Sequence, residues 1–106
     1  MELSVHDRIV LNSLLMGHKD DFATLKLVRQ FREELSFSND ENEKLHFKVN
    51  GQGMEWSDAA DKEIGTKEIT VESSIATIIE NVLKEISKSK NLTDELFSYY
   101  VRFVKE

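Results

Sequence analysis

The strongest restriction on the fold comes from a continuous apolar stripe in the last third of the chain. Apolar residues occur at positions i, i+3, i+4, i+7, i+8 and i+11, namely Ile75, Ile78, Ile79, Val82, Leu83 and Ile86. Because an α-helix completes a turn every 3.6 residues, this spacing places all six side chains on one face. The sequence therefore predicts a helix over about residues 73–89 whose apolar face packs against other elements.

Capping residues and apolar spacing predict three more helices. Ser4, with an acidic residue three positions later, forms a capping-box pattern before a helix over about 5–16. One of the two aspartates at 20 and 21 caps a second helix that runs to about Leu35. Thr93 caps the last helix, whose first turn is acidic.

The middle of the chain changes to the alternating pattern of strands. Residues 45–49 and 54–56 alternate with period two, and the Asn-Gly pair between them is a strong hairpin signal. Residues 67–71 predict a third strand, after a polar loop over 58–66. Leu45, Phe47 and Val49 are expected to face the core, with His46 and Lys48 outward. Residues 38–44 form either a loop or one short helical turn.

Together these elements predict an α+β fold in which four helices pack around a small antiparallel β-sheet. The sheet is the hairpin plus the third strand, and the order is α-α-β-β-β-α-α. A chain of 106 residues is expected to form one domain, 1–106. The predicted core consists of apolar residues turned inward, namely Ile9, Leu14, Phe22, Leu25, Val28, Phe31, Phe47, Ile75, Ile79, Val82, Leu83, Ile86, Tyr100 and Phe103.

The amino-acid composition excludes several kinds of site and indicates where in the cell the protein is located. Cysteine is absent, which excludes disulfides, thiolate metal sites and cysteine nucleophiles. No apolar run approaches the ~20 residues of a membrane span, and the N-terminus has no secretory-signal pattern. We therefore expect a cytoplasmic protein that does not insert into a membrane.

The formal charge of −6 is concentrated in the middle of the chain. Residues 40–72 hold nine acidic and four basic residues, a net charge of −5. Such a surface weighs against non-specific binding to phosphate backbones, for which a basic face supplies most of the affinity.

No pattern in the sequence predicts a catalytic or metal site. The histidines at 6, 18 and 46 are isolated and lack the spacing of metal ligands. A nucleophile elbow, a P-loop and a Gly-rich dinucleotide fingerprint are all missing. We therefore expect a non-enzymatic protein with no cofactor and no metal.

Two sets of residues are candidates for contact with a partner. Trp56 is either a core-edge residue or an exposed anchor for another protein, because tryptophan is enriched in binding hot spots. Tyr100 is expected to face inward with Phe97 and Phe103, which leaves Tyr99 on an exposed flank as a second candidate contact. The apolar face of this last helix serves either the core or a homodimer interface.

The second set supports an alternative function in DNA binding. Two helices, a turn and a hairpin suggest a winged helix-turn-helix arrangement, in which Lys26, Arg29 and Arg32 contact phosphates. Against it, the predicted hairpin carries only Lys48 as a basic residue and lies in the acidic region. By elimination, an interaction with another protein is the leading hypothesis.

Two segments, 21–38 and 92–103, resemble a family of small, uncharacterised proteins of tailed phages and prophages. Trp56 and the sequence Lys-Glu-Ile at 67–69 are placed as in that family, so the resemblance spans nearly the whole chain. It implies a phage or prophage origin and a role in the cytoplasm of the infected host. It implies no catalytic residues. The leading hypothesis, a protein that binds another protein as a regulator, adaptor or host-factor inhibitor, comes from elimination and not from this resemblance.

Overall fold

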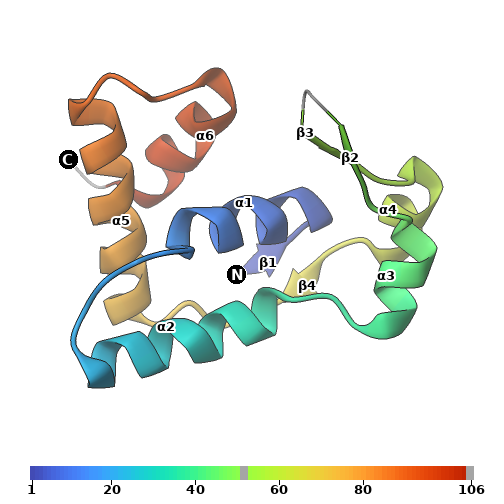
Figure 1. Cartoon of the computed structure of the whole chain (residues 1–106), viewed down its shortest axis with the longest axis horizontal. Helices are drawn as coiled ribbons and strands as arrows, with labels where there is room; N and C mark the ends of the chain where they lie inside the picture. Colours follow the sequence, from blue (N-terminus) through green and yellow to red (C-terminus); the bar gives the residue numbers. More distant parts are fainter. Residues whose placement is uncertain (51–52, 105–106) are drawn as a thin grey trace.

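The computed structural model describes residues 1–50 and 53–104, and within them it contains six helices and four short strands (Figure 1). In chain order these are β1 (Glu2–Leu3), α1 (Val5–Leu15), α2 (Phe22–Leu35), α3 (Asn39–Leu45), β2 (Lys48–Asn50), β3 (Gly53–Glu55), α4 (Asp58–Ile64), β4 (Lys67–Glu68), α5 (Ser73–Lys88) and α6 (Asp94–Phe103). The α+β class is confirmed. The predicted order is wrong, because two further helices and the strand β1 are present.

Helices α1, α2, α5 and α6 enclose the larger hydrophobic core. In Figure 1, α1 lies between α2 and α6, and α5 closes one end of this arrangement. The predicted stripe on α5 is confirmed, since Ile75, Ile78, Ile79 and Leu83 are buried. The core consists of Leu3, Val10, Leu11, Leu15, Val28, Phe31, Leu35, Ile69, Ile75, Ile78, Ile79, Leu83, Tyr99, Phe103 and Val104.

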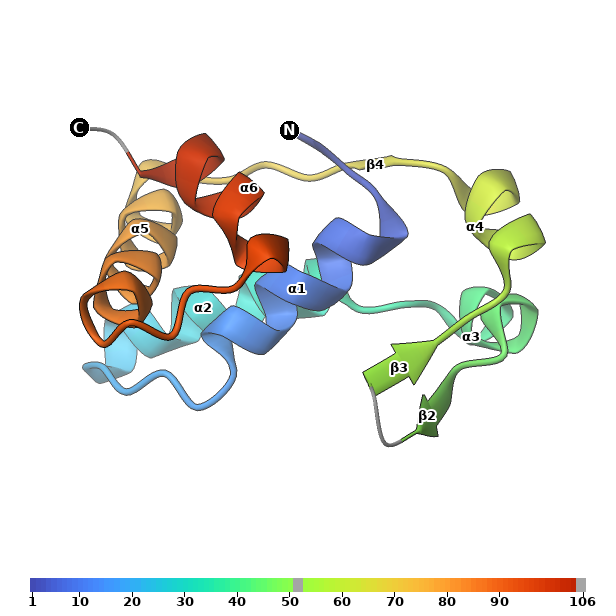
Figure 2. The ribbon, with the colours of Figure 1, turned by 90° about the horizontal axis from the view of Figure 1, so that it is seen from above.

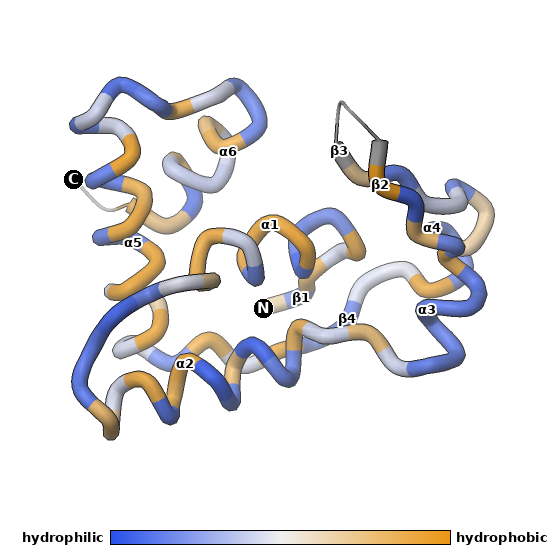
Figure 3. The backbone as a smooth tube through the Cα atoms, in the orientation of Figure 1, coloured by the Kyte–Doolittle hydropathy of each residue, from blue (hydrophilic) through white to orange (hydrophobic). Residues whose placement is uncertain are grey.

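A smaller lobe, residues 39–64, contains α3, β2, β3 and α4, and we call it the acidic lobe. It holds seven acidic and three basic residues, and hydrophilic residues dominate α3 (Figure 3). A second hydrophobic cluster forms where this lobe meets α1, around Val5, Leu45 and Ala60. The Lys44 ammonium lies 2.9 Å from the Glu63 carboxylate and links α3 to α4.

The two additional helices, α3 and α4, each begin after a serine N-cap. The Ser38 hydroxyl accepts a hydrogen bond from the Glu41 backbone N–H, and the Glu41 carboxylate accepts one from the Ser38 backbone N–H. This capping box begins a helix, so the undecided segment 38–44 is helical. The loop predicted over 58–66 is wrong, because Ser57 caps α4 by accepting from the Ala60 backbone. Two alanines in α4 add to its helix propensity.

Two of the three predicted strands are shorter than predicted, and the described strands form two separate sheets. Leu45 ends α3, and His46 follows it in the left-handed conformation with φ 49°, so β2 begins only at Lys48. The predicted third strand shrinks to β4, which pairs antiparallel with β1 rather than with the hairpin. Figure 2 shows β4 in a long connection along one side of the molecule from α4 to α5.

The predicted hairpin is confirmed by the antiparallel pairing of β2 with β3. The Gly51-Gln52 turn itself lies outside the described residues. Leu45 is buried and Phe47 is half-buried, as expected of core-facing residues, and His46 and Lys48 are exposed. The inward position predicted for Val49 is wrong, because its side chain is exposed.

Most of the predicted core is buried at least in part. Fully buried are Val28, Phe31, Ile75, Ile79, Leu83 and Phe103. Half-buried are Ile9, Leu14, Leu25, Phe47, Val82, Ile86 and Tyr100. The placement of Phe22 is wrong: it is the first residue of α2, before the helix reaches the core, and 84% of it is exposed.

Candidate functional site

A groove of about 390 Å³ separates α1 from the acidic lobe. Its lining consists of Arg8, Ile9, Asn12, Ser13, Met16, Leu35, Ser36, Phe37, Asn42, Phe47 and Met54. On α1 the lining residues recur every three or four positions from Arg8 to Met16, so the groove follows one helix face. At 1.5 Å per residue this face extends about 12 Å, which is the length of two helical turns.

Large apolar side chains form both walls of this groove and remain open to solvent. Met16, which directly follows α1, is 61% exposed, and Met54 on the hairpin is 45% exposed. Val49 pairs directly with Met54 across the hairpin, so the two side chains lie on the same face of the strands. Methionine is flexible and polarizable, which makes it suited to surfaces that adapt to a partner.

Arg8, on α1, contacts two other segments near the groove, the end of α2 and the start of α3. Only 1% of this residue is exposed, and its Nε donates to the backbone oxygen of Leu35 at 3.1 Å. Its Nη2 donates to the backbone oxygen of Ser36 at 2.6 Å, and its Nη1 to Glu41 at 3.0 Å. The guanidinium also lies 4.0 Å from the centre of the Phe37 ring. Arg8 thus fixes α3 and the end of α2 against α1.

The pairing with Arg8 has a measurable consequence for the pH dependence of stability. Hydrogen bonding to Arg8 lowers the pKa of Glu41 from 4.5 to about 2. Because this pKa is lower in the folded state, the pair stabilises the fold above about pH 4.5 and loses this contribution as the pH falls toward 2. We therefore expect Glu41→Gln to reduce the pH dependence of the free energy of unfolding between these two pH values, with the free energy measured by urea denaturation.

The matched control for this measurement is Glu43→Gln, since Glu43 is exposed on the same helix. This control is expected to keep the wild-type slope. An unchanged slope in Glu41→Gln would contradict the assignment of the acid-side loss to the Arg8 pair.

The predicted exposed position of Tyr99 is wrong. Only 3% of Tyr99 is exposed, and its hydroxyl donates to Asp7 at 2.7 Å and lies 3.0 Å from Nδ1 of His6. Burial, together with the hydrogen bond to Asp7, raises the pKa of the Tyr99 hydroxyl above its usual value. Phe97 faces solvent instead, so α6 is rotated about its axis relative to the prediction. Tyr99 joins α6 to α1 and is not an exposed contact.

Trp56 is half-buried at the edge of the second hydrophobic cluster. Its Nε1 donates to Asp61 at 2.7 Å, and its ring packs edge-on against Phe47 at a centroid distance of 6.1 Å. The core-edge interpretation fits this geometry, because the polar end of the indole already has a partner within the chain. Through Phe47, Trp56 supports the wall of the groove rather than lining it.

The three predicted phosphate contacts are not equivalent. Lys26 and Arg29 are exposed on α2 and line one shallow hollow with Phe22 and Glu33. Arg32 is half-buried, and its Nε donates to the Asn12 side chain at 2.9 Å. The exposed basic face is therefore formed by two cations and interrupted by a carboxylate.

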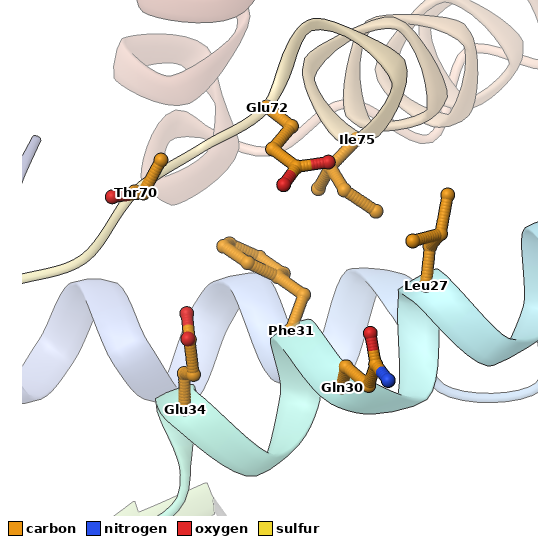
Figure 4. A pocket seen from close by; sticks show the side chains of 7 residues that line it. All are labelled: Leu27, Gln30, Phe31, Glu34, Thr70, Glu72 and Ile75. Carbon is orange, nitrogen blue, oxygen red and sulfur yellow. The ribbon is translucent and has the colours of Figure 1, made fainter.

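A pocket between α2 and the segment before α5 has a different character (Figure 4). It holds only about 100 Å³ and is lined by Leu27, Gln30, Phe31, Glu34, Thr70, Glu72 and Ile75. Figure 4 shows the two carboxylates projecting from opposite sides of a small space. A ligand of drug size needs roughly 300 Å³ or more, so this pocket admits only a very small molecule.

Among residues 1–50 and 53–104, no group of three or more histidine, cysteine, aspartate or glutamate side chains is arranged to hold a metal ion. Over the same residues, each helix is too short or too polar to cross a bilayer. Comparison with protein-family models, with curated proteins and with solved structures finds no match to this chain.

No sequence pattern marks the residues that form the groove as a binding surface. Met16 follows a helix end, Met54 lies in a three-residue strand, and Phe37 lies in a connection, so no periodic pattern relates them. The available signal was the alternation on the hairpin, which pairs Val49 with Met54 on one face. Its interpretation as a core face concealed an exposed apolar surface.

Proposed function

We propose that this chain is a non-enzymatic module that binds another protein through the groove between α1 and the acidic lobe. The observation that carries the proposal is the exposure of Met16 and Met54 on opposite walls of one apolar groove. Exposed apolar side chains that gather in one place mark interaction sites more often than the same residues scattered singly.

The dimensions and the charge of this region favour one kind of partner. A groove about two turns long receives the apolar stripe of a short amphipathic helix, with anchors at i, i+3 or i+4, and i+7. The acidic lobe beside it, with its excess of four acidic residues, favours lysine or arginine on the flank of that helix. The proposed partner segment is therefore a basic amphipathic helix of another protein.

The resemblance to small phage proteins suggests the setting. A compact acidic protein that captures a basic helix suits a regulator, an adaptor or an inhibitor of a host factor in the cytoplasm of an infected cell. We propose this setting from the resemblance and the groove together.

The test is a selection from displayed random peptides of about 16 residues, which are long enough for four helical turns. Peptides are selected on the wild-type protein after depletion on a Met16→Asp, Met54→Asp double variant. We expect enriched peptides with apolar residues at helical spacing and a basic flank. Their affinity, measured by fluorescence anisotropy, should fall about tenfold or more on the double variant, because each substitution places a charge in an apolar contact.

Phe22→Asp provides the matched control, because Phe22 is at least as exposed but lies on α2, outside the groove lining. Its affinity for the selected peptides should equal that of the wild type. Failure to enrich any sequence, or equal binding by the double variant, would contradict the groove as the binding site.

DNA binding by α2 is the alternative, and the shared exposure of Lys26 and Arg29 favours it. A labelled duplex is titrated at low and at high salt with the wild type and with a Lys26→Ala, Arg29→Ala double variant. Affinity that falls steeply with salt and is lost in this variant would support the alternative. An absence of binding at low salt would exclude it.

A further inference from the structure

A second hollow, of about 290 Å³, lies beside the groove and is lined by Asn12, Arg29, Arg32, Glu33 and Ser36. Asn12 and Ser36 also line the groove, so the two spaces meet where α1 packs against the end of α2. We call the second space the basic hollow, because it is lined by two arginines and one carboxylate in a chain with a net charge of −6. Positive charge therefore adjoins the groove on the side that α2 forms.

Arg32 offers its charged end to the basic hollow in a fixed position. Its Nε donates to the Asn12 side chain at 2.9 Å, which holds the guanidinium against α1. The terminal nitrogens Nη1 and Nη2 have no hydrogen-bond partner among the described residues. Because no buried side-chain nitrogen there lacks a partner, these two nitrogens are open to solvent. A guanidinium held in this way has a free pair of donors, which matches the two oxygens of a carboxylate.

Neither arginine of the basic hollow is neutralised within the described chain. Two of the four arginines, Arg8 and Arg102, form ion pairs with carboxylates. Over residues 1–50 and 53–104, Arg29 and Arg32 form none, and Glu33 lies beyond ion-pair distance of both. Arg29 and Arg32 are three positions apart on α2 and are therefore neighbours on its surface. Two adjacent cations without a counter-charge, in a chain with an excess of acids, favour an anionic group from outside.

We propose that the partner helix carries a carboxylate, from an aspartate or a glutamate, that binds Arg32 and Arg29 in the basic hollow. This inference rests on the proposed function and adds one acidic position to the basic amphipathic helix. A helix that lies along α1 has the hairpin of the acidic lobe on one flank and α2 on the other (Figure 1). The basic residues of the partner helix therefore face the acidic lobe, and its carboxylate lies on the opposite flank.

The position of Asn12 sets the spacing between this carboxylate and the apolar anchors. Asn12 borders the basic hollow and comes one helical turn before Met16, which lines the same groove. In a helix that runs along α1, the carboxylate is therefore three or four residues from the apolar residue that packs on Met16. We expect selected peptides to combine apolar anchors at helical spacing with one acidic residue at this distance.

The experiment uses the peptide that is most enriched in the selection on the wild-type protein. Fluorescence anisotropy compares its affinity for the wild type, Arg29→Glu and Arg32→Gln. Each variant should bind about fivefold more weakly, the upper end for an ion pair open to solvent. This loss should shrink in about 0.5 M salt, which screens exposed charges. Lys26→Glu is the matched control, because it carries the same charge change on α2 outside the lining of both spaces, and it should bind like the wild type.

A charge exchange distinguishes a direct ion pair from a disturbed fold. The acidic residue of the peptide is replaced by lysine, which should weaken binding to the wild type. The same lysine peptide should bind Arg29→Glu more tightly than the original peptide does, because opposite charges again meet across the contact. A disturbed fold would weaken both peptides alike. Arg29 is exposed, so the thermal midpoint of Arg29→Glu is expected to change little.

The outcomes separate this inference from the proposed function. Peptides that depend on the groove methionines but bind both arginine variants as tightly as the wild type would overturn the inference and leave the proposed function standing. Selected peptides that contain no acidic residue would have the same meaning. A selection that enriches no peptide would overturn both.

Discussion

Replacing Arg8 by methionine is expected to lower the free energy of unfolding by about 3–5 kcal/mol, the range found when one partner of a buried ion pair is removed. Methionine preserves much of the packing volume but donates no hydrogen bond. The backbone oxygens of Leu35 and Ser36 then lose their guanidinium donors where α2 ends. A buried polar group without a partner costs about 1–3 kcal/mol. This cost applies in full to the buried Leu35 contact and less to the Ser36 oxygen, because that contact is only partly buried.

Urea denaturation measures this loss, and Arg32→Met is the matched control. Arg32 also connects α2 to α1, through one hydrogen bond to Asn12, but it is only half-buried. A single hydrogen bond of this kind contributes about 1 kcal/mol, so the control should lose far less than the Arg8 variant. Equal losses in the two variants would show that Arg8 has no special role in joining the acidic lobe to the larger core.

The importance of Arg8 could not be predicted from the sequence, because its partners are remote along the chain. Its guanidinium donates to backbone oxygens at positions 35 and 36 and to Glu41. Every residue has a backbone oxygen, so the sequence does not show which of them accepts a hydrogen bond from Arg8. An arginine on an amphipathic helix is also usually exposed. The capping and spacing rules that predicted α1 do not indicate which distant residues the side chains of that helix contact.

Helices were predicted correctly where apolar spacing or a capping residue gave one clear pattern. The stripe on α5 predicted both the helix and its buried face, and Thr93 and Asp21 cap their helices as expected. On α6 the apolar residues span a wide arc, so the sequence fitted more than one rotation of the helix. The hydrogen bonds from Tyr99 to α1 select the observed rotation, and these are contacts across more than 90 residues.

The candidate groove was unpredictable for a similar reason. Its two methionines come from a helix end and a hairpin that meet only after the acidic lobe has docked. By contrast, the exposure of Lys26 and Arg29 followed from helical spacing alone. Sequence patterns thus identified surfaces that lie on one element and missed the surface that several segments form together.

Leu83→Ala is expected to cost about 2–5 kcal/mol, the range for removing a leucine side chain from a packed core. Leu83 is fully buried in the middle of α5, within the cluster that joins α1, α2 and α6. Alanine favours the helix at least as well as leucine, so the loss measures the cavity and not a weakened helix. Set against a total stability of about 5–15 kcal/mol, it would leave a marginal fold.

Phe22→Ala provides the contrast, because it removes a larger apolar side chain from a helix of the same chain. Phe22 is mostly exposed, so its removal should change the free energy of unfolding by no more than about 0.5 kcal/mol. Should Leu83→Ala fail to fold, Ile79→Val tests the same core with an expected loss of about 0.5–1.5 kcal/mol. Losses near zero at both Leu83 and Ile79 would mean that the apolar stripe does not hold α5 in place. The packing of α5 against α6, and with it the outward position of Phe97, would then be wrong as well.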